Sequence, residues 1–358
     1  MPSAFCYNGL GINSGVYDMT SYDKILGGLL AAALGDAMGS VTETRSREQI
    51  IEKFGGKVTE LMKAPDDVFA RDFPMGSVTD DFSLAYCTAL EIINAGGNIT
   101  DEVAKKALLR WSQTEYFKLA GPTTIGAVKR LKGEEVSGPY DFLSVDNSKG
   151  SNGSAMKISP VGLASHGNIK KAMRDAVTIC KPTHYNSTSL AGACAVSAAV
   201  SEAMHDESTI ESIIKAGLVG AKYGDEVGRR AGKELANPSV YKRIKLAVSI
   251  ANNCKGDIDR TMEELIDIIG CGLSAAEAVP VAFGLLVACE GRTMDCITAA
   301  VNIGNDTDTI ATILGAMVGT YNGVDDELLR YLDIIDSVND FDLKMVAAEL
   351  EMLGGSHE

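Results

Sequence analysis

The chain has 358 residues, of which 46% are hydrophobic, and it carries a formal net charge of −15 at pH 7. This length accommodates one large domain with a substantial buried core. Phosphate neutralisation needs clustered Lys and Arg side chains, so the acidic balance argues against nucleic acid as the main partner.

The start of the chain and the cysteines bear on its compartment. Residues 1–20 lack a basic stretch followed by an apolar run, so we expect an irregular lead-in and no secretory signal. No segment reaches about 18 uninterrupted apolar residues, so no membrane span is expected. The eight cysteines form no metal-type CxxC pair, and four of them, Cys87, Cys194, Cys289 and Cys296, fall inside apolar helical patterns. Buried free thiols in a reducing cytoplasm are the simplest explanation.

Helical periodicity dominates the first part of the chain from Tyr22 onward. Apolar pairs recur every four residues as far as Met38, which predicts a helix with one wide buried face that ends at Gly39. Residues 57–62 are the best strand candidate. A second helix is expected to begin at Thr79.

The remainder of the chain repeats this pattern. Residues 138–160 are loop-like, with a Ser-Lys-Gly-Ser-Asn-Gly-Ser core. Further helices are predicted at residues 190–204, 210–219, 241–251, 262–269, 275–288, 294–301, 310–321, 325–338 and 343–353. Gly315 and Gly319 permit close helix packing, and Gly323 is a predicted helix stop. No composition break or fixed-period repeat divides residues 21–358, so we predict a single, mostly α-helical domain.

Two short acidic clusters precede apolar helices more than two hundred residues apart. They are Thr79-Asp80-Asp81 and Asp306-Thr307-Asp308-Thr309. Each residue type also suits a helix start, since Thr caps N-termini and acids favour the positive end of the helix dipole. Capping needs only one acceptor, however, and crowded carboxylates are costly without cations. Carboxylate and hydroxyl oxygens are ligands that Mg²⁺ and Mn²⁺ prefer, so converging clusters would supply a two-metal hydrolytic site.

Two further acids lie near the end of the first predicted helix. Glu43 follows that helix, where an exposed Glu is usually just solvated. Asp36 lies near the helix C-terminus, which is unfavourable for a negative charge. We therefore predict a specific hydrogen bond for Asp36, for example one that ties the turn positioning Glu43.

A small-residue loop and one histidine are candidate substrate contacts. Residues 151–157 read Ser-Asn-Gly-Ser-Ala-Met-Lys, which fits a flexible loop and also fits a backbone that lies against phosphate or ribose. Thr183-His184 presents one of only four histidines. A lone His is more often structural than catalytic, and no Ser/His/Asp or Cys/His order is readable.

Together these motifs resemble the ADP-ribosylglycohydrolase family, of the dinitrogenase-reductase-activating glycohydrolase type, over residues 24–323. The motifs in order are Gly35-Asp36-Ala37-Met38-Gly39 with Glu43, Thr79-Asp80-Asp81, Asn152-Gly153-Ser154-Ala155-Met156-Lys157, Thr183-His184 and Gly304-Asn305-Asp306-Thr307-Asp308-Thr309. The resemblance implies an all-α fold, a single compact orthogonal helical bundle, with two Mg²⁺ or Mn²⁺ ions in a central cleft.

The resemblance also implies a role for each motif. The implied metal ligands are Thr79, Asp80, Asp81, Asp306, Asp308 and Thr309. Glu43 is implied as the acid that faces the reacting ribose carbon, and it is assigned to catalysis together with Asp80 and Asp81. The implied substrate contacts are Asn152, Gly153, Ser154, Ala155, Met156 and His184.

Four residues depart from the family pattern. Val41 replaces a frequent Pro, Phe82 a common Thr, Lys157 a frequent Arg, and Asn305 a Gly. None removes an implied ligand. Phe82, Lys157 and Asn305 are expected near the cleft, where they bear on substrate identity.

The expected function is metal-dependent hydrolysis of the glycosidic bond at the anomeric carbon of an ADP-ribosyl group. Such cleavage passes through an oxocarbenium-like state and needs a positioned water. The ADP-ribosyl group is expected on a protein side chain, such as arginine or serine, or on a small-molecule conjugate. The alternative is a nucleoside or ribosyl N-glycohydrolase. A non-catalytic role like that of the family's lens crystallins predicts eroded ligands, whereas all six implied ligands are present here.

Overall fold

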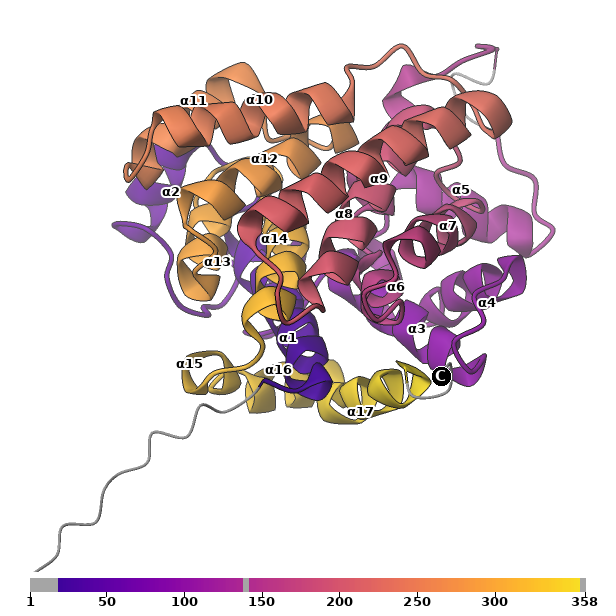
Figure 1. Ribbon diagram of the computed structural model, residues 1–358, viewed down its shortest axis with the longest axis horizontal. Helices are drawn as coiled ribbons and strands as arrows, with labels where there is room; N and C mark the ends of the chain where they lie inside the picture. The colour runs from indigo at the N-terminus through magenta and orange to yellow at the C-terminus, as the bar shows by residue number, and fades with distance from the viewer. Residues whose placement is uncertain (1–18, 138–141, 355–358) are drawn as a thin grey trace, which may run out of the picture.

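The computed structural model describes residues 19–137 and 142–354, and this part of the chain is built from α-helices (Figure 1). The α-helices are α1 Ser21–Thr42, α2 Arg47–Phe54, α3 Asp80–Asn94, α4 Asp101–Trp111, α5 Pro122–Leu131, α6 Ser159–Leu163, α7 Ile169–Cys180, α8 Ser187–Ala203, α9 Ile210–Ala231, α10 Val240–Asn253, α11 Ile258–Ile268, α12 Ala275–Ala288, α13 Thr293–Val301, α14 Thr307–Asn322, α15 Asp326–Leu329, α16 Leu332–Asn339 and α17 Leu343–Gly354. Short 3₁₀ turns occur at η1 Phe69–Asp72, η2 Glu115–Leu119, η3 Asn147–Lys149 and η4 Asn152–Ser154. Among the described residues only two isolated β-bridges occur, so the predicted all-α class is confirmed.

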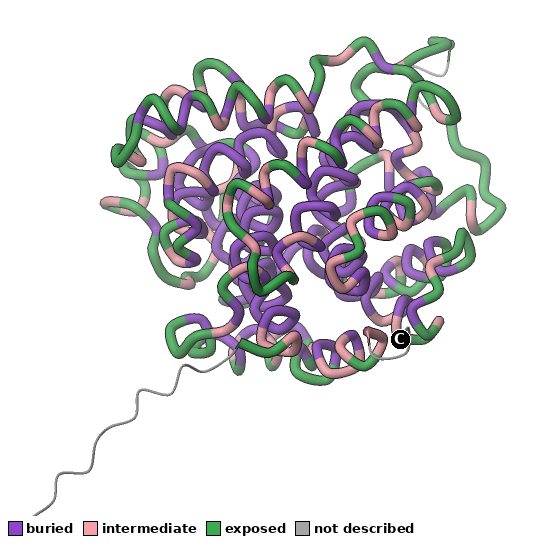
Figure 2. The backbone as a smooth tube through the Cα atoms, viewed as in Figure 1, coloured by how far each residue is buried: buried purple, intermediate pink, exposed green. Residues whose placement is uncertain are grey.

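The core is made of helices that are apolar on every side. In α1 every residue from Lys24 to Thr42 is buried, and α8, α12 and α14 are buried along almost their whole length. Helices of this kind belong inside a large domain, whereas amphipathic ones cover it. Figure 2 shows the buried central tubes surrounded by partly exposed outer helices, of which α10 and α11 lie along one edge and α15 to α17 along the opposite one.

Glycines allow α1 and α14 to pack backbone against backbone. A Cβ atom on Gly39 would lie 2.5 Å from the Cα of Asp308, and one on Gly319 would lie 2.1 Å from the carbonyl oxygen of Gly27. Real Cβ atoms do not approach other atoms so closely, so only glycine fits these contacts. The consequence for function is direct, because this contact sets the C-terminal part of α1 beside the first turn of α14.

Gly39 is therefore a packing residue and does not end the helix. The predicted stop there is wrong, because α1 continues to Thr42 and Glu43 is its C-cap. Gly323 does follow the end of α14, with φ +68°, as predicted. Helix α1 is long and apolar enough to suit a membrane span by composition, but its apolar window is entirely buried in the protein.

Several other predictions about local structure need correction. Residues 57–62 form no strand, because Val58 exchanges its two backbone hydrogen bonds with the side-chain amide of Asn302, at 2.8 and 2.7 Å. The predicted helix at 325–338 is divided into α15 and α16. Helices α2, α4, α5, α6 and α7 were not predicted, although α4 begins with a strong signal, a Thr100 cap followed by two acids.

The predicted loop at 138–160 includes residues 138–141, which lie outside the described part, as do residues 1–18. Its described remainder contains η3 and η4, and it ends inside α6. The seven cysteines in the described ranges are free and buried, in line with the expected role of Cys87, Cys194, Cys289 and Cys296.

Candidate functional site

The first acidic cluster lies at the N-terminus of α3. The Thr79 side chain caps the helix and accepts a hydrogen bond from the Asp81 N–H at 3.2 Å. Asp36 of α1 supplies the other acceptor, since its Oδ2 receives the N–H groups of Thr79 at 2.9 Å and of Phe82 at 2.8 Å. The carboxyl group of Asp36 thus holds the start of α3 against α1. The predicted specific hydrogen bonding of Asp36 is confirmed, but it ties the start of α3 and not the turn at Glu43.

The second cluster lies at the N-terminus of α14. Asp306 is the N-cap residue, and its backbone N–H donates to the carbonyl of Cys271 at 3.1 Å. Thr307 donates its hydroxyl to the Gly39 carbonyl at 2.8 Å and so ties α14 to α1. The Asp308 Oδ1 accepts the N–H of Thr309 at 3.0 Å. Sequence reasoning assigned no task to Thr307, which here joins the two helices that carry the acids.

Tertiary packing brings the two clusters and Glu43 into one electrostatic field. Burial raises the pKa of Glu43 to about 10, and the negative charges of Asp308, Asp306 and Asp80 add to that rise. Burial, followed by the charge of Asp308, raises the pKa of Asp36 to about 7.

The remaining carboxyl groups behave in the same way. Burial is the main reason that the pKa of Asp308 is raised to about 6. The pKa values of Asp80, Asp81 and Asp306 lie well above the usual range, first because of burial and second because of the Asp308 charge. Six carboxyl groups from distant parts of the chain therefore repel one another in one place, although Asp80 stays partly exposed.

Two carboxylate oxygens at this site have no hydrogen-bond partner. They are Oδ1 of Asp36 and Oδ2 of Asp81, and both are buried. Within residues 19–137 and 142–354, however, no three Asp, Glu, His or Cys side chains form a ready-made metal-ligand group. The carboxylates are close enough to raise one another's pKa, but their oxygens do not converge on a single point. Buried oxygens without a donor are unfavourable, so they are suited to a positive ligand.

The small-residue loop joins this site to His184. Asn152 donates its side-chain amide to Asp306, and its backbone N–H binds the Leu273 carbonyl at 2.9 Å. Ser151 Oγ lies 2.9 Å from Nε2 of His184. Burial, then the charges of nearby lysines, lowers the pKa of His184 well below its usual value, so this ring is neutral at pH 7. The loop is a buried structural element, and the flexible-loop interpretation is wrong.

The other predicted contacts in this loop are placed differently from one another. Gly153 lies against the His184 ring, since a Cβ atom on it would be 3.1 Å from that ring. Ser154 is fully buried and donates to the carbonyl of Ser189 at 2.8 Å. Ala155 and Met156 belong to the apolar core. Only the Asn152 side chain reaches the acidic residues directly.

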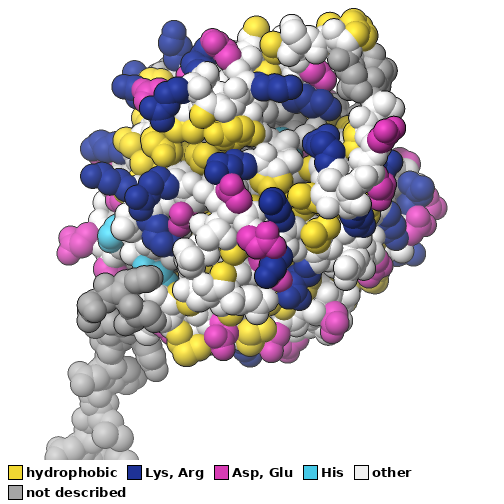
Figure 3. All heavy atoms as spheres, turned by 90° about the vertical axis from the view of Figure 1, so that its right-hand side faces the viewer, with side chains coloured by type: hydrophobic (Ala, Val, Ile, Leu, Met, Phe, Trp, Pro, Cys, Tyr) yellow, Lys and Arg dark blue, Asp and Glu magenta, His cyan; other side chains and the backbone are white. Residues whose placement is uncertain are grey.

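A groove of about 730 Å³ opens beside His184. Its wall includes Thr183 and Tyr185, which flank His184 in the chain, and four of its lining residues are basic: Arg130, Lys149, Lys181 and Lys233. Asp146 is the only acidic residue that lines it in the described part of the chain. Figure 3 views the side on which α4, α5 and α7 lie in Figure 1, and Lys and Arg side chains are prominent there. In a protein with a net charge of −15, this groove is a local positive region.

A sequence profile of the ADP-ribosylglycohydrolase family matches residues 18–350, nearly the whole chain. The chain belongs to the ADP-ribosylglycohydrolase family. Among its relatives is the human ADP-ribosylhydrolase ARH3, which is 29% identical over 326 residues that cover 85% of this chain and 87% of the relative.

Two more relatives extend this comparison. The uncharacterized protein YegU of Escherichia coli (strain K12) is 28% identical over 92% of this chain and 96% of its own length. The ADP-ribosylarginine hydrolase Tri1 of Pseudomonas putida (strain GB-1) is 25% identical over 84% of this chain and 71% of its own length. A solved structure described as an ADP-ribosylglycohydrolase-related protein complex shares the fold, with a TM-score of 0.64, 20% identity and coverage of 93% and 98%. The chain is thus an enzyme of the ADP-ribosyl hydrolase type.

The departures from the ADP-ribosylglycohydrolase pattern fall in three different environments. Phe82 is fully buried, its N–H donates to Asp36 at 2.8 Å, and its ring lies 5.9 Å from that of Phe341. Lys157 is buried and donates to Oγ1 of Thr183 at 2.9 Å, on the wall of the basic groove. Asn305 is exposed and directly precedes Asp306.

Proposed function

We propose that this chain hydrolyses the glycosidic bond at the anomeric carbon of an ADP-ribosyl group with the help of two divalent cations, Mg²⁺ or Mn²⁺. The observation that carries the proposal is the shared field of six buried or half-buried carboxyl groups at the ends of α1, α3 and α14. Such crowding is unfavourable for folding, and a protein gains from it when the site binds positive charge.

The residues at this site fit hard cations. Carboxylate and hydroxyl oxygens are the donors that Mg²⁺ and Mn²⁺ prefer, and a buried oxygen of Asp81 lacks any hydrogen bond. The residues that would hold the ions are Thr79, Asp80, Asp81, Asp306, Asp308 and Thr309. When bound, the ions would stabilise negative charge that develops on the reacting groups.

Glu43 is the acid that we place closest to the reaction. Its carboxyl group is half-buried at the C-cap of α1, and its pKa is raised to about 10 by burial and by neighbouring aspartates. A carboxyl group whose proton affinity depends so strongly on nearby charge is suited to hold or release a proton during cleavage. Glu43 would orient or deprotonate the attacking water, or protonate the leaving group, with Asp80 and Asp81 beside it.

The groove favours a substrate that carries phosphate over a neutral nucleoside. Arg130, Lys149, Lys181 and Lys233 line it beside His184, and Asn152 connects this region to the acidic cluster. A pyrophosphate is attracted by such a cationic wall, whereas a nucleoside gains nothing from it. The relatives named for ADP-ribosyl substrates support the same choice. The leaving group is a protein side chain or a small molecule, and we further propose a cytoplasmic location, which the buried free thiols support.

Hydrolysis assays with each substrate class test the proposal. Purified protein would be incubated with ADP-ribosylated protein, with a small ADP-ribosyl conjugate and with a nucleoside panel, in Mg²⁺, Mn²⁺ or EDTA. We expect turnover of an ADP-ribosyl substrate that EDTA abolishes. Glu43→Gln should lower kcat by about 10²–10⁴-fold, and Asp80→Ala and Asp308→Ala should be inactive but folded by circular dichroism.

Two results would reject the proposal. Retained activity in both aspartate variants would remove the acidic cluster from the reaction. Turnover of nucleosides with none of the ADP-ribosyl substrates would establish the alternative, a nucleoside glycohydrolase.

A further inference from the structure

The chain leaves α1 through a strained segment that lies between Glu43 and the second acidic cluster. Thr44 has φ +69°, a conformation that a β-branched residue rarely adopts, and Asn305 has φ +61°. The Thr44 N–H donates to the Asn305 carbonyl at 2.7 Å, and the Asn305 N–H donates to the Arg45 carbonyl at 2.8 Å. These two hydrogen bonds set the backbone after Glu43 against the backbone before Asp306. Strain of this kind persists only where surrounding contacts maintain it.

The side chain of Arg45 supplies contacts that maintain this segment. It turns back along α1, and its Nη1 donates to the carbonyls of Val41 and Glu43, both at 3.3 Å. The guanidinium group also lies 5.8 Å from the ring centre of Phe54. Only 8% of the Arg45 side chain is exposed, so this cation is buried beside the peptide that carries Glu43.

Asp67 is the partner that neutralises this buried cation. Its Oδ1 accepts a hydrogen bond from Nη2 of Arg45, and no other ion pair of Arg45 occurs in the described ranges. Asp67 belongs to the connection between α2 and α3, which has little regular structure. The connection is anchored separately near its start and its end, because Val58 binds Asn302 and the Val78 N–H binds the Asn339 side chain at 2.9 Å.

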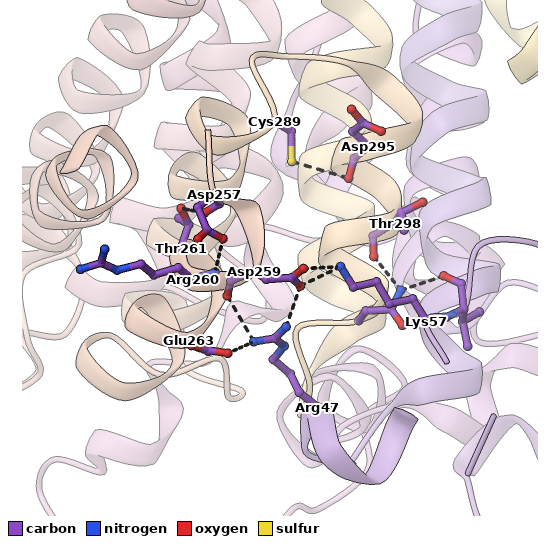
Figure 4. Close-up of polar contacts among 12 residues, drawn as sticks. Arg47, Lys57, Asp257, Asp259, Arg260, Thr261, Glu263, Cys289, Asp295 and Thr298 are labelled. Carbon is purple, nitrogen blue, oxygen red and sulfur yellow. Dashed lines mark hydrogen bonds and ion pairs between the residues drawn. The ribbon is translucent and has the colours of Figure 1, made fainter. Parts of the chain in front are cut away.

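The start of this connection has additional anchors of its own. Arg47 of α2 pairs with Asp259 and Glu263 of α11 at 2.8 and 3.2 Å, and Lys57 pairs with Asp259 at 2.7 Å (Figure 4). Helix α2 and residue 57 are therefore held without Asp67. Loss of the Asp67 carboxylate is expected to act locally, on Arg45 and the segment it supports.

We infer that the Arg45–Asp67 ion pair is a positioning element that holds the Glu43 carboxyl group in register with Asp306 and Asp308. The inference rests on the proposed function for its effect on catalysis. Without Asp67 the guanidinium is left as an uncompensated buried charge, which a protein avoids by moving the group towards water. The Glu43 carbonyl then loses its donor, Thr44 is free to leave its strained conformation, and the Glu43 side chain turns with it.

Asp67→Asn removes the charge and keeps the shape, and Asp72→Asn is its matched control. Asp72 lies in the same connection, is 72% exposed, and pairs only with the adjacent Arg71 at 3.8 Å among the described residues. We expect Asp67→Asn to lower kcat by about 10- to 100-fold with KM and divalent-cation binding almost unchanged. Asp67→Glu should recover part of the loss, and Asp72→Asn should match the wild type. Lys53→Gln removes the other partner of Asp67 and should also leave kcat unchanged.

Hydrogen exchange at residues 43–46 and at Asn305 gives a readout that does not depend on activity. Faster exchange at Thr44 and Asn305 is expected in Asp67→Asn but not in Asp72→Asn. If Asp67→Asn does not fold, Arg45→Lys takes its place in the experiment, because it keeps the positive charge but loses the paired donors of the guanidinium group. Arg45→Lys should show the same faster exchange at Thr44 and Asn305. Unchanged exchange overturns the inference whatever the kinetics show, as does an equal loss of kcat in both Asn variants. Absence of ADP-ribosyl hydrolysis in the wild type would reject the proposed function. Hydrogen exchange would still test whether Asp67 maintains the segment after Glu43.

Discussion

The crowded carboxyl groups predict an unusual pH dependence of stability in the absence of divalent cations. A raised pKa means that the folded protein binds protons more tightly than the unfolded chain, so the free energy of unfolding falls as pH rises through that interval. The pKa of Asp36 rises from 3.8 to about 7, and this carboxyl group is fully buried. At about 1.4 kcal/mol per pKa unit, Asp36 alone accounts for a loss of about 4 kcal/mol between pH 4 and pH 7.

Thermal unfolding followed by circular dichroism in EDTA tests this prediction. A loss of about 4 kcal/mol corresponds to a fall in Tm of about 5 °C for a chain of this size. We expect Tm to fall from pH 4.5 to pH 7.5, and Mg²⁺ or Mn²⁺ to raise Tm more at pH 7.5 than at pH 4.5. Asp36→Asn, which keeps one acceptor oxygen for α3, should reduce the slope, and the other five carboxyl groups should retain the remainder.

Two results would contradict this reasoning. A Tm in EDTA that stays constant or rises over this pH range would show that the carboxyl groups do not repel one another in solution. An equal response to cations at both pH values would separate cation binding from the acidic cluster.

Two further predictions concern residues that position the site. Asp36→Ala leaves two buried N–H groups at the start of α3 without an acceptor. We therefore expect it to be less stable than Asp36→Asn by about 2–5 kcal/mol in urea unfolding at pH 7. Equal stability of the two variants would argue against the capping role. Gly39→Ala places a methyl group 2.5 Å from the backbone of Asp308 and should cost about 1–3 kcal/mol and weaken Mn²⁺ binding measured by calorimetry. Gly121→Ala, where a Cβ meets nothing within 4 Å, is the control, and an equally small effect at both positions would contradict the packing argument.

Much of the fold was predictable from local pattern. Apolar periodicity located α8 and α10 to α14 to within a few residues, and Thr79 was correctly placed at the start of α3. Glycine was harder to interpret, because the same residue type ends α14 at Gly323 and permits close packing at Gly39. The difference depends on what lies opposite the glycine, which is a property of the packed molecule.

For the candidate site too, some features were predictable from the sequence and others depend on the packed molecule. The residues of its acidic clusters were readable from the sequence, since paired acids with threonines exceed what helix capping needs. The supporting contacts were not readable. Asp36 acts on α3, Asn152 on Asp306, and Asp67 on Arg45, and each of these contacts joins residues that are distant in the chain or separated by an irregular connection.

The amino-acid sequence by itself determined the helical class, the boundaries of most buried helices and the chemical identity of the acids, because these depend on side-chain type and short-range periodicity. The tertiary structure decided that Glu43, Asp80 and Asp308 share one field, because glycine contacts bring α1 and α14 together and Asp36 fixes α3 against α1. Electrostatic repulsion and pKa depend on distance and burial, and these quantities exist only after helices far apart in the chain have packed.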